Sequence, residues 1–137
     1  MKKLLKVARA KTDEASRRIG DLQSALEQTQ RSLRLLEDAV ASEEAAMSAA
    51  EIVGFVHLAG YLAGAAQKRA AMTATRADLE AELETARTGL SEAFAEMKRL
   101  ELLIERARLH AEKSRRKAES GRADEAAIMR FTRTNAR

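Results

Sequence analysis

The chain has 137 residues with no cysteine, no proline and no tryptophan, and aromatic residues make up 3% of it. The lack of cysteine excludes a disulfide scaffold, a thiolate zinc site and a cysteine nucleophile, and the abundant alanine, leucine, glutamate and arginine favour long helices packed in pairs. The net charge of +4 is uneven, because residues 1–11 carry five basic groups and no acidic one, and residues 105–137 carry ten basic and five acidic groups.

The N-terminal segment "MKKLLKVARAK" begins like a secretion signal. Its apolar part, however, is only Leu4 and Leu5 before Lys6 follows. A signal peptide needs a longer apolar core and a cleavage site of small residues. We therefore expect no export signal here.

A first series of core-type residues predicts a helix from about residue 3 to residue 45. Steps of three and four residues alternate over six heptads, which is the spacing of a coiled-coil seam. The intervening positions are mostly charged or polar. The series is Leu5, Ala8, Thr12, Ala15, Ile19, Leu22, Leu26, Thr29, Leu33, Leu36, Val40, Glu43 and Met47.

A turn is expected somewhere within residues 44–58. The segment "SAAE" at Ser48–Glu51 has the spacing of a capping box and favours a helix start near Ser48. Gly54 could instead end the first helix in a left-handed conformation. The local signals leave both positions open.

The least polar stretch, "EIVGFVHLAGYLAGAA", lies next to this turn. Its apolar part, 52–66, is shorter than the roughly 20 residues that a membrane-spanning helix needs. Two interpretations remain for Phe55, Leu58, Tyr61 and Leu62. They either close the end of a hairpin, or part of the patch stays exposed and binds a partner.

A second seam predicts a return helix over about 58–125, followed by a C-terminal tail at 126–137 that is free to fray. Two seams of this length can pair as a single all-α domain, an antiparallel two-helix coiled-coil hairpin. The seam comprises Leu79, Leu83, Ala86, Leu90, Ala93, Met97, Leu100, Ile104, Ala107, Ala111, Ser114 and Ala118.

The pairing register is open in steps of seven residues. With Val40 opposite Leu79, large residues face large residues and Glu43 faces Arg76. A slip of one heptad places Glu43 opposite Arg69 instead. Both registers keep the seams together, so the heptads alone do not decide between them.

The open end of this hairpin is expected to be basic and loosely packed. Both seams fade there to alanine, threonine and serine, which bury little apolar area, and the two chain termini are expected to meet there. The candidate partner-binding residues at this end are Lys2, Lys3, Lys6, Arg9, Lys11, Lys113, Arg115, Arg116, Lys117 and Arg122.

No motif for catalysis or for a cofactor occurs in the sequence. There is no Walker loop, no GxGxxG and no HExxH, and His57 and His110 are far apart. We predict a protein that is not an enzyme and has no metal or cofactor. Acidic residues interrupt the basic run near the C-terminus, which weakens a nucleic-acid interpretation.

The order and spacing of several segments over nearly the whole chain resemble the FliJ family, coiled-coil proteins of the bacterial flagellar type III export apparatus, in its alphaproteobacterial variety. The segments are "TDEASRRIGDL" at Thr12–Leu22, "EDAVASEE" before the turn, the aromatic patch with Phe55 and Tyr61, "AAQKR" at Ala65–Arg69, "LEAELETARTGLSEAFAEMKRLELLIER" at Leu79–Arg106 and "ADEAAIMRF" at Ala123–Phe131.

The resemblance implies a stalk-like connector with three kinds of partner: a hexameric export ATPase whose central pore takes the open end, the cytoplasmic part of the export gate, and export chaperones that the protein escorts. It implies a cytoplasmic location at the inner membrane, held there through partners only, and no nucleic acid. The alternatives are a generic cytoplasmic coiled-coil adaptor or chaperone subunit and, third, a basic nucleic-acid-associated helical hairpin.

Overall fold

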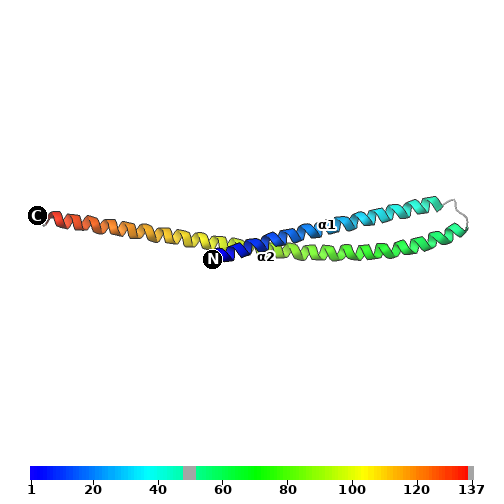
Figure 1. Ribbon diagram of the computed structural model, residues 1–137, viewed down its shortest axis with the longest axis horizontal. Helices are drawn as coiled ribbons and strands as arrows, with labels where there is room; N and C mark the ends of the chain where they lie inside the picture. Colours follow the sequence, from blue (N-terminus) through cyan, green and yellow to red (C-terminus); the bar gives the residue numbers. More distant parts are fainter. Residues whose placement is uncertain (48–51, 136–137) are drawn as a thin grey trace. The chain divides into compact units, whose positions relative to one another are not determined.

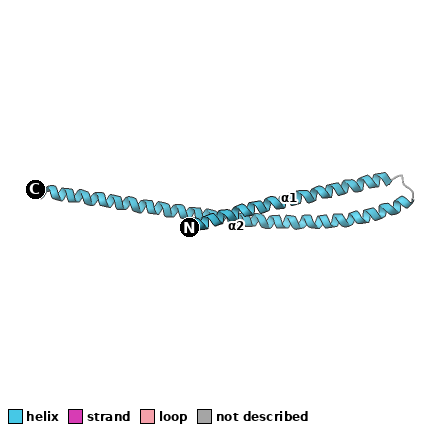
Figure 2. Ribbon diagram, in the orientation of Figure 1, coloured by secondary structure: helices cyan, strands magenta, loops and turns pink. Residues whose placement is uncertain are grey.

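The computed structural model describes residues 1–47 and 52–135, and this part of the chain forms two helices and no strand (Figures 1 and 2). Helix α1 spans Lys2–Met47 and helix α2 spans Ile52–Asn135. Ion pairs and half-buried apolar side chains join the two helices. The predicted all-α, antiparallel two-helix hairpin is confirmed.

Helix α2 is longer than expected at both ends. It begins before residue 58, and it continues through residue 125 to Asn135. Gly54 lies within α2, and no described glycine has a positive φ, so the left-handed cap considered at Gly54 is wrong. The capping box predicted at Ser48–Glu51 lies outside the described residues.

Both helices run without interruption because nothing in them breaks a helix. No proline occurs in the chain, and six threonine hydroxyls donate to a backbone carbonyl inside the helices. Thr29 donates to the Ala25 carbonyl at 3.0 Å, and Thr85 donates to the Ala81 carbonyl at 3.1 Å. These bonds to the carbonyl four residues back let threonine sit in a helix without an unpaired hydroxyl.

The chain divides into two compact units, each with a segment of both helices. The tip unit is Lys11–Ala93. The terminal unit comprises Met1–Ala10 and Phe94–Arg137.

A single seam forms the core of the tip unit. Leu22, Leu33, Ala65 and Leu83 are its buried side chains, with 4% to 7% of their surface exposed. No polar side chain is buried among the described residues, and no side chain there is fully enclosed. Each buried leucine contributes about 1.5–3 kcal/mol to stability. Because this core is a single layer with few buried side chains, the stability of the tip unit depends mainly on these leucines.

The seam of α2 begins earlier than the sequence predicted. It continues back from Leu79 towards the turn with the same steps of three and four residues. Its members there are half-buried or buried, which shows that they face α1. They are Arg76, Met72, Ala65, Leu62 and Leu58.

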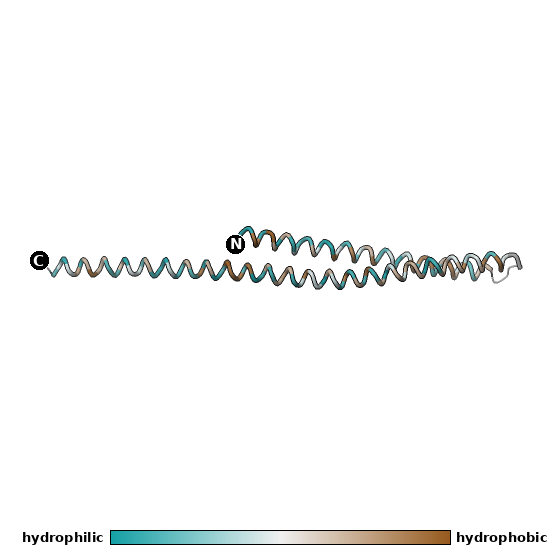
Figure 3. Tube along the Cα trace, turned by 90° about the horizontal axis from the view of Figure 1, so that it is seen from below, coloured by the Kyte–Doolittle hydropathy of each residue, from teal (hydrophilic) through white to brown (hydrophobic). Residues whose placement is uncertain are grey.

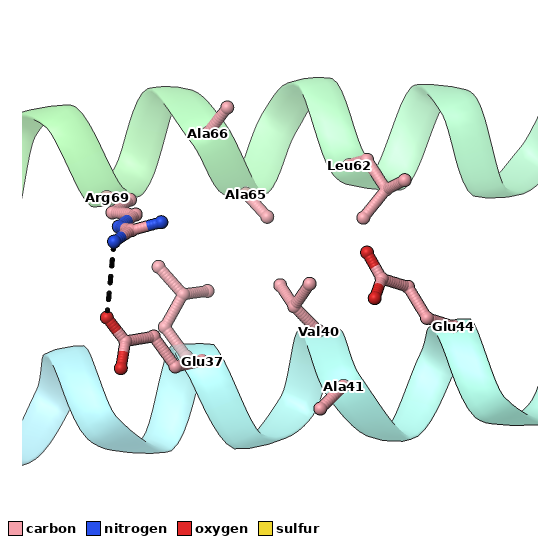
Figure 4. A pocket seen from close by; sticks show the side chains of 9 residues that line it. Glu37, Val40, Ala41, Glu44, Leu62, Ala65, Ala66 and Arg69 are labelled. Atoms are coloured by element: carbon pink, nitrogen blue, oxygen red, sulfur yellow. Dashed lines mark ion pairs between the residues drawn. The ribbon is translucent and has the colours of Figure 1, made fainter.

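The register of the tip unit differs from both registers considered for the sequence. An ion pair of 3.6 Å joins Glu37 Oε1 and Arg69 Nη2. Val40 and Ala65 line the same groove (Figure 4). Val40 therefore lies level with Ala65, two heptads or about 21 Å from Leu79.

Both proposed partners of Glu43 are consequently wrong. Glu43 is exposed, and it forms no ion pair within the described part of the chain. Arg69 lies one heptad too far along α2 to meet it in this register, because Arg69 pairs with Glu37. Seam positions repeat every seven residues, so several registers bring the two seams face to face. The partner of Glu43 could therefore not be chosen from the heptads.

In the terminal unit, the start of α1 packs on the middle of α2. Ala8 is buried, and Leu5 and Ile104 are half-buried. Arg9 Nη2 lies 3.6 Å from Glu101 Oε1, so the two helices lie side by side here. Apolar and polar positions alternate along both helices (Figure 3).

Beyond Ile104, α2 continues without α1 beside it. Every described residue after Ile104 is exposed except Glu112 and Ala126. The end of α2 lies well beyond the start of α1 (Figure 1), so the start of α1 and the end of α2 do not meet as expected. The two-heptad difference in register leaves the predicted seam residues Ala107, Ala111, Ser114 and Ala118 exposed.

Candidate partner-binding surfaces

The apolar patch next to the turn is partly exposed. Phe55 is 60% exposed and Tyr61 is 39% exposed. Leu58 and Leu62 are half-buried because they continue the seam towards α1. The patch therefore divides into two leucines that pack between the helices and two aromatic residues that face outward.

Helix geometry separates the two aromatic residues. Six positions at about 100° each place Phe55 and Tyr61 about 120° apart around α2. They flank the half-buried seam on opposite sides. Val56, which is 69% exposed, lies off the seam. It is a further exposed apolar residue of this patch, and its position away from the three-four spacing of the seam is the signal for it in the sequence.

An open groove of about 320 Å³ lies between the helices near this patch. In Figure 4, Val40 and Leu62 point into it from opposite helices, and the Glu37–Arg69 ion pair closes one end. The groove exists where the small side chain of Ala65 leaves space in the seam. Its lining residues are Leu36, Glu37, Val40, Ala41, Glu44, Leu62, Ala65, Ala66 and Arg69.

The basic residues at the start of α1 are all exposed. Lys2, Lys3 and Lys6 form no ion pair within the described residues, whereas Arg9 pairs with Glu101. Lys11 begins the tip unit. This segment presents free positive charge to its surroundings.

The second basic group lies on the unaccompanied part of α2. Arg116 pairs with Glu112 at 2.7 Å, and Arg115 approaches Glu119 at 4.0 Å. Other members of the predicted set, Lys113, Lys117 and Arg122, form no ion pair with a described residue. The structure thus separates the basic residues that the sequence analysis had placed at one end.

Ion pairs along one side of α2 support this exposed segment. Arg108 bonds to Glu105 at 2.8 Å and to Glu112 at 3.3 Å. The hydrogen bond from Arg108 and the charge of its guanidinium lower the pKa of the Glu105 carboxyl from its ordinary value. The hydrogen bond to Glu105 and the charge of that carboxylate in turn raise the pKa of Arg108. Pairs three and four residues apart stabilise a helix that has little packing of its own.

The pKa of Glu101 is also lowered, where α1 meets α2 in the terminal unit. The hydrogen bond from Lys98 is the main cause, and the charges of Lys98 and Arg9 add to it while partial burial opposes it. Lys98 also lies 5.3 Å from the centre of the Phe94 ring. Of these contacts, the one between Arg9 and Glu101 joins α1 to α2.

The described residues hold no group of three or more histidine, cysteine, aspartate or glutamate side chains that could bind a metal ion. His57 and His110 are both exposed. In the described helices, no segment is long and apolar enough to cross a membrane.

The comparison with protein families identifies the chain. Neither a curated protein nor a solved structure matches it. A family model described as "Flagellar FliJ protein" matches residues 1–136, which is nearly the whole chain. The chain belongs to the FliJ family, and it is a component of the flagellar export apparatus.

Proposed function

We propose that the chain is a non-enzymatic, stalk-like connector between the hexameric export ATPase and the export gate, and that it escorts export chaperones. It acts in the cytoplasm, at the inner membrane, where its partners hold it. The observation that carries this proposal is the unaccompanied, basic part of α2 that follows Ile104. A single helix of about 30 residues is roughly 45 Å long and narrow enough to enter a ring.

The basic residues on this segment supply the contact with the ATPase. The free charges of Lys113, Lys117 and Arg122 suit acidic side chains or backbone carbonyls that line a pore. The basic start of α1, with Lys2, Lys3, Lys6, Arg9 and Lys11, provides a second contact with the same ring.

The aromatic residues beside the turn supply the contact with the gate or a chaperone. Phe55 and Tyr61 expose large apolar surface on α2, and exposed aromatic residues are frequent centres of binding energy in interfaces. Leu58 and Leu62 lie between them at the seam. Between the two contacts, the packed seam transmits position or torque, since close-packed interiors resist compression and bending.

Charge reversal of Arg115, Arg116 and Lys117 to glutamate tests the contact with the ATPase. Binding to the ATPase ring and stimulation of ATP hydrolysis are expected to fall at least tenfold, because three favourable contacts become repulsive. Circular dichroism checks that α2 keeps its helical content, since the change removes two ion pairs. Unchanged ring binding would contradict the proposal.

A matched control keeps the charge change and moves it. Arg31, Lys68 and Arg87 are exposed in the tip unit and form no ion pair there with described residues. Their change to glutamate is expected to leave ring binding within about twofold. Equal losses in both triple variants would indicate that only net charge matters.

A further inference from the structure

Two open grooves lie on the same side of the seam in the tip unit. The groove of about 320 Å³ meets a second groove, of about 370 Å³, at the ion pair between Glu37 and Arg69. Exposed side chains of α1 and α2 beside these grooves form one face of the tip unit, which we call the groove face. Its members are Gln30, Arg34, Glu37, Ala41 and Glu44 on α1, and Phe55, Ala59, Ala63, Ala66, Ala70, Thr73 and Ala77 on α2.

The groove face carries two charges of opposite sign that form no ion pair with a described residue. Arg34 lines the second groove, and Glu44 lines the first. Both are exposed, and ten residues of α1 separate them by about 15 Å, so they cannot pair with each other. A second copy of α1, running antiparallel about the midpoint at Ala39, would bring Arg34 of each copy level with Glu44 of the other.

The groove face of α2 has its own midpoint, at Ala66. Ala59 and Thr73 lie seven residues on either side of it, and Phe55 and Ala77 lie eleven residues on either side. In a second copy of α2 that runs antiparallel about Ala66, Ala77 would lie level with Phe55, which is 60% exposed. The small side chains between them would let the two copies of α2 approach closely, since the distance between packed helices depends on the side chains at the contact.

The register of the hairpin brings the two midpoints to the same level. Val40 lies level with Ala65, so Ala39 lies level with Ala66. One two-fold axis at this level therefore relates the charges of α1 and the apolar residues of α2 at the same time. A surface that is complementary to itself about one axis is what a symmetric dimer requires.

We propose that two copies of the chain associate through their groove faces, antiparallel and about this two-fold axis. The two tip units then form a four-helix bundle in which α1 packs on α1 and α2 on α2 of the second copy. This inference rests on the packing of the tip unit and does not depend on the proposed function.

The size of the contact sets the strength of this dimer. It covers about 30 Å of α2 and about 20 Å of α1, each over a width of about 10 Å. The total for both copies is roughly 1,000 Å², the lower limit for a specific interface, so we expect a micromolar dissociation constant. The dimer covers Phe55 and leaves Tyr61 exposed, because Tyr61 lies about 140° from Ala66 around α2. A partner that binds Phe55 therefore competes with the second copy.

Exchange of the two unpaired charges tests the symmetry of the contact. In sedimentation equilibrium of the full chain, from about 1 to 100 µM, Arg34→Glu and Glu44→Arg are each expected to weaken the dimer about tenfold, because two attractive pairs become repulsive. The double variant is expected to return to within about threefold of the unchanged chain. Since the two residues lie about 15 Å apart in one chain, this recovery can come only from a contact between copies.

The matched control for the charge change is Lys68→Glu. Lys68 is exposed and lies about 160° from Ala66 around α2, away from the groove face, so this variant should dimerise like the unchanged chain. Circular dichroism checks that every variant keeps its helical content.

A single introduced cysteine locates the axis, because the chain has no cysteine. Ala66→Cys places one thiol of each copy beside the axis, where a disulfide can form, since it needs Cα atoms within about 7 Å. In a glutathione redox buffer it is expected to give at least about fivefold more linked dimer than Ala71→Cys, an exposed position about 140° away on the same helix.

Three results would overturn the proposal. One is a chain that stays monomeric up to about 100 µM. Another is a double charge variant that is as weak as either single variant. The third is linked dimer from Ala66→Cys at no more than the yield from Ala71→Cys.

Discussion

Truncation of Leu83 to alanine should remove a large share of the stability of the tip unit. Leu83 is only 6% exposed and is one of few buried residues there. Leucine-to-alanine changes in protein cores cost about 2–5 kcal/mol, and alanine recovers a few tenths through its helix propensity. A seam with no fully enclosed side chain lies at the lower end of this range, so we expect a loss of about 2–3 kcal/mol.

The free energy of unfolding is measured by urea titration followed by circular dichroism. Leu35→Ala is the matched control, because Leu35 is 65% exposed and its loss should cost less than about 0.5 kcal/mol. Titrations at two protein concentrations separate the hairpin from any self-association. Equal effects of the two substitutions would refute the argument that this seam holds the helices together.

Three further results are expected. Gly60→Ala and Gly64→Ala should each stabilise α2 by about 0.5–1 kcal/mol in urea titrations, because both glycines are helical and a Cβ there meets nothing within 4 Å. Phe55→Ala with Tyr61→Ala should weaken gate binding at least tenfold in a pull-down with purified gate domain, with little change in melting temperature. Acidification through the lowered pKa of Glu105 should reduce helicity, as this carboxyl becomes protonated and its pair with Arg108 is lost.

Each of these has an outcome that contradicts it. A glycine replacement that destabilises α2 would show that this segment is not a regular helix. Lost stability with intact gate binding would assign the two aromatic residues to packing. The pKa of Glu105 is lowered in the folded state, so its ion pair contributes stability above the unfolded pKa, and this contribution is lost as pH falls through the folded pKa. The variant Glu105→Gln should therefore lose less helicity on acidification than the unchanged chain, and an equal loss in both would contradict the prediction.

The sequence predicted the seams well and their alignment poorly. Apolar residues from Leu5 to Val40 recur with coiled-coil spacing, and nearly all of them face the partner helix. Periodicity says which side of a helix is buried, and it carries no information about which heptad lies opposite which. The observed register, with Val40 level with Ala65, depends on packing along the whole seam.

Two arginines explain why the apolar repeat of α2 is recognised in the sequence only from Leu79 onward. Arg69 and Arg76 interrupt the apolar repeat, so Leu58 and Leu62 were interpreted as an isolated patch. In the structure both leucines continue the three-four spacing towards the turn. Arginine can occupy a seam edge because its apolar stem packs while its charged end stays in water.

The same error explains the misplaced chain termini. A register displaced by two heptads moves the start of α1 about 21 Å along α2. Basic residues expected to gather at one end are therefore divided between the start of α1 and the exposed segment of α2 that holds Lys113 and Lys117. The sequence shows which residues belong to each basic group. How far apart the two groups lie depends on the register in which the helices pair.

Site-specific photo-crosslinking in the assembled export apparatus tests the connector function most directly. A photoreactive residue at Lys117 is expected to crosslink to the export ATPase, and one at Val56 to the export gate or a chaperone. Both positions are exposed, so the probe should not disturb the seam. Crosslinking of both positions to the same partner, or no capture of the ATPase from Lys117, would contradict a connector between the two.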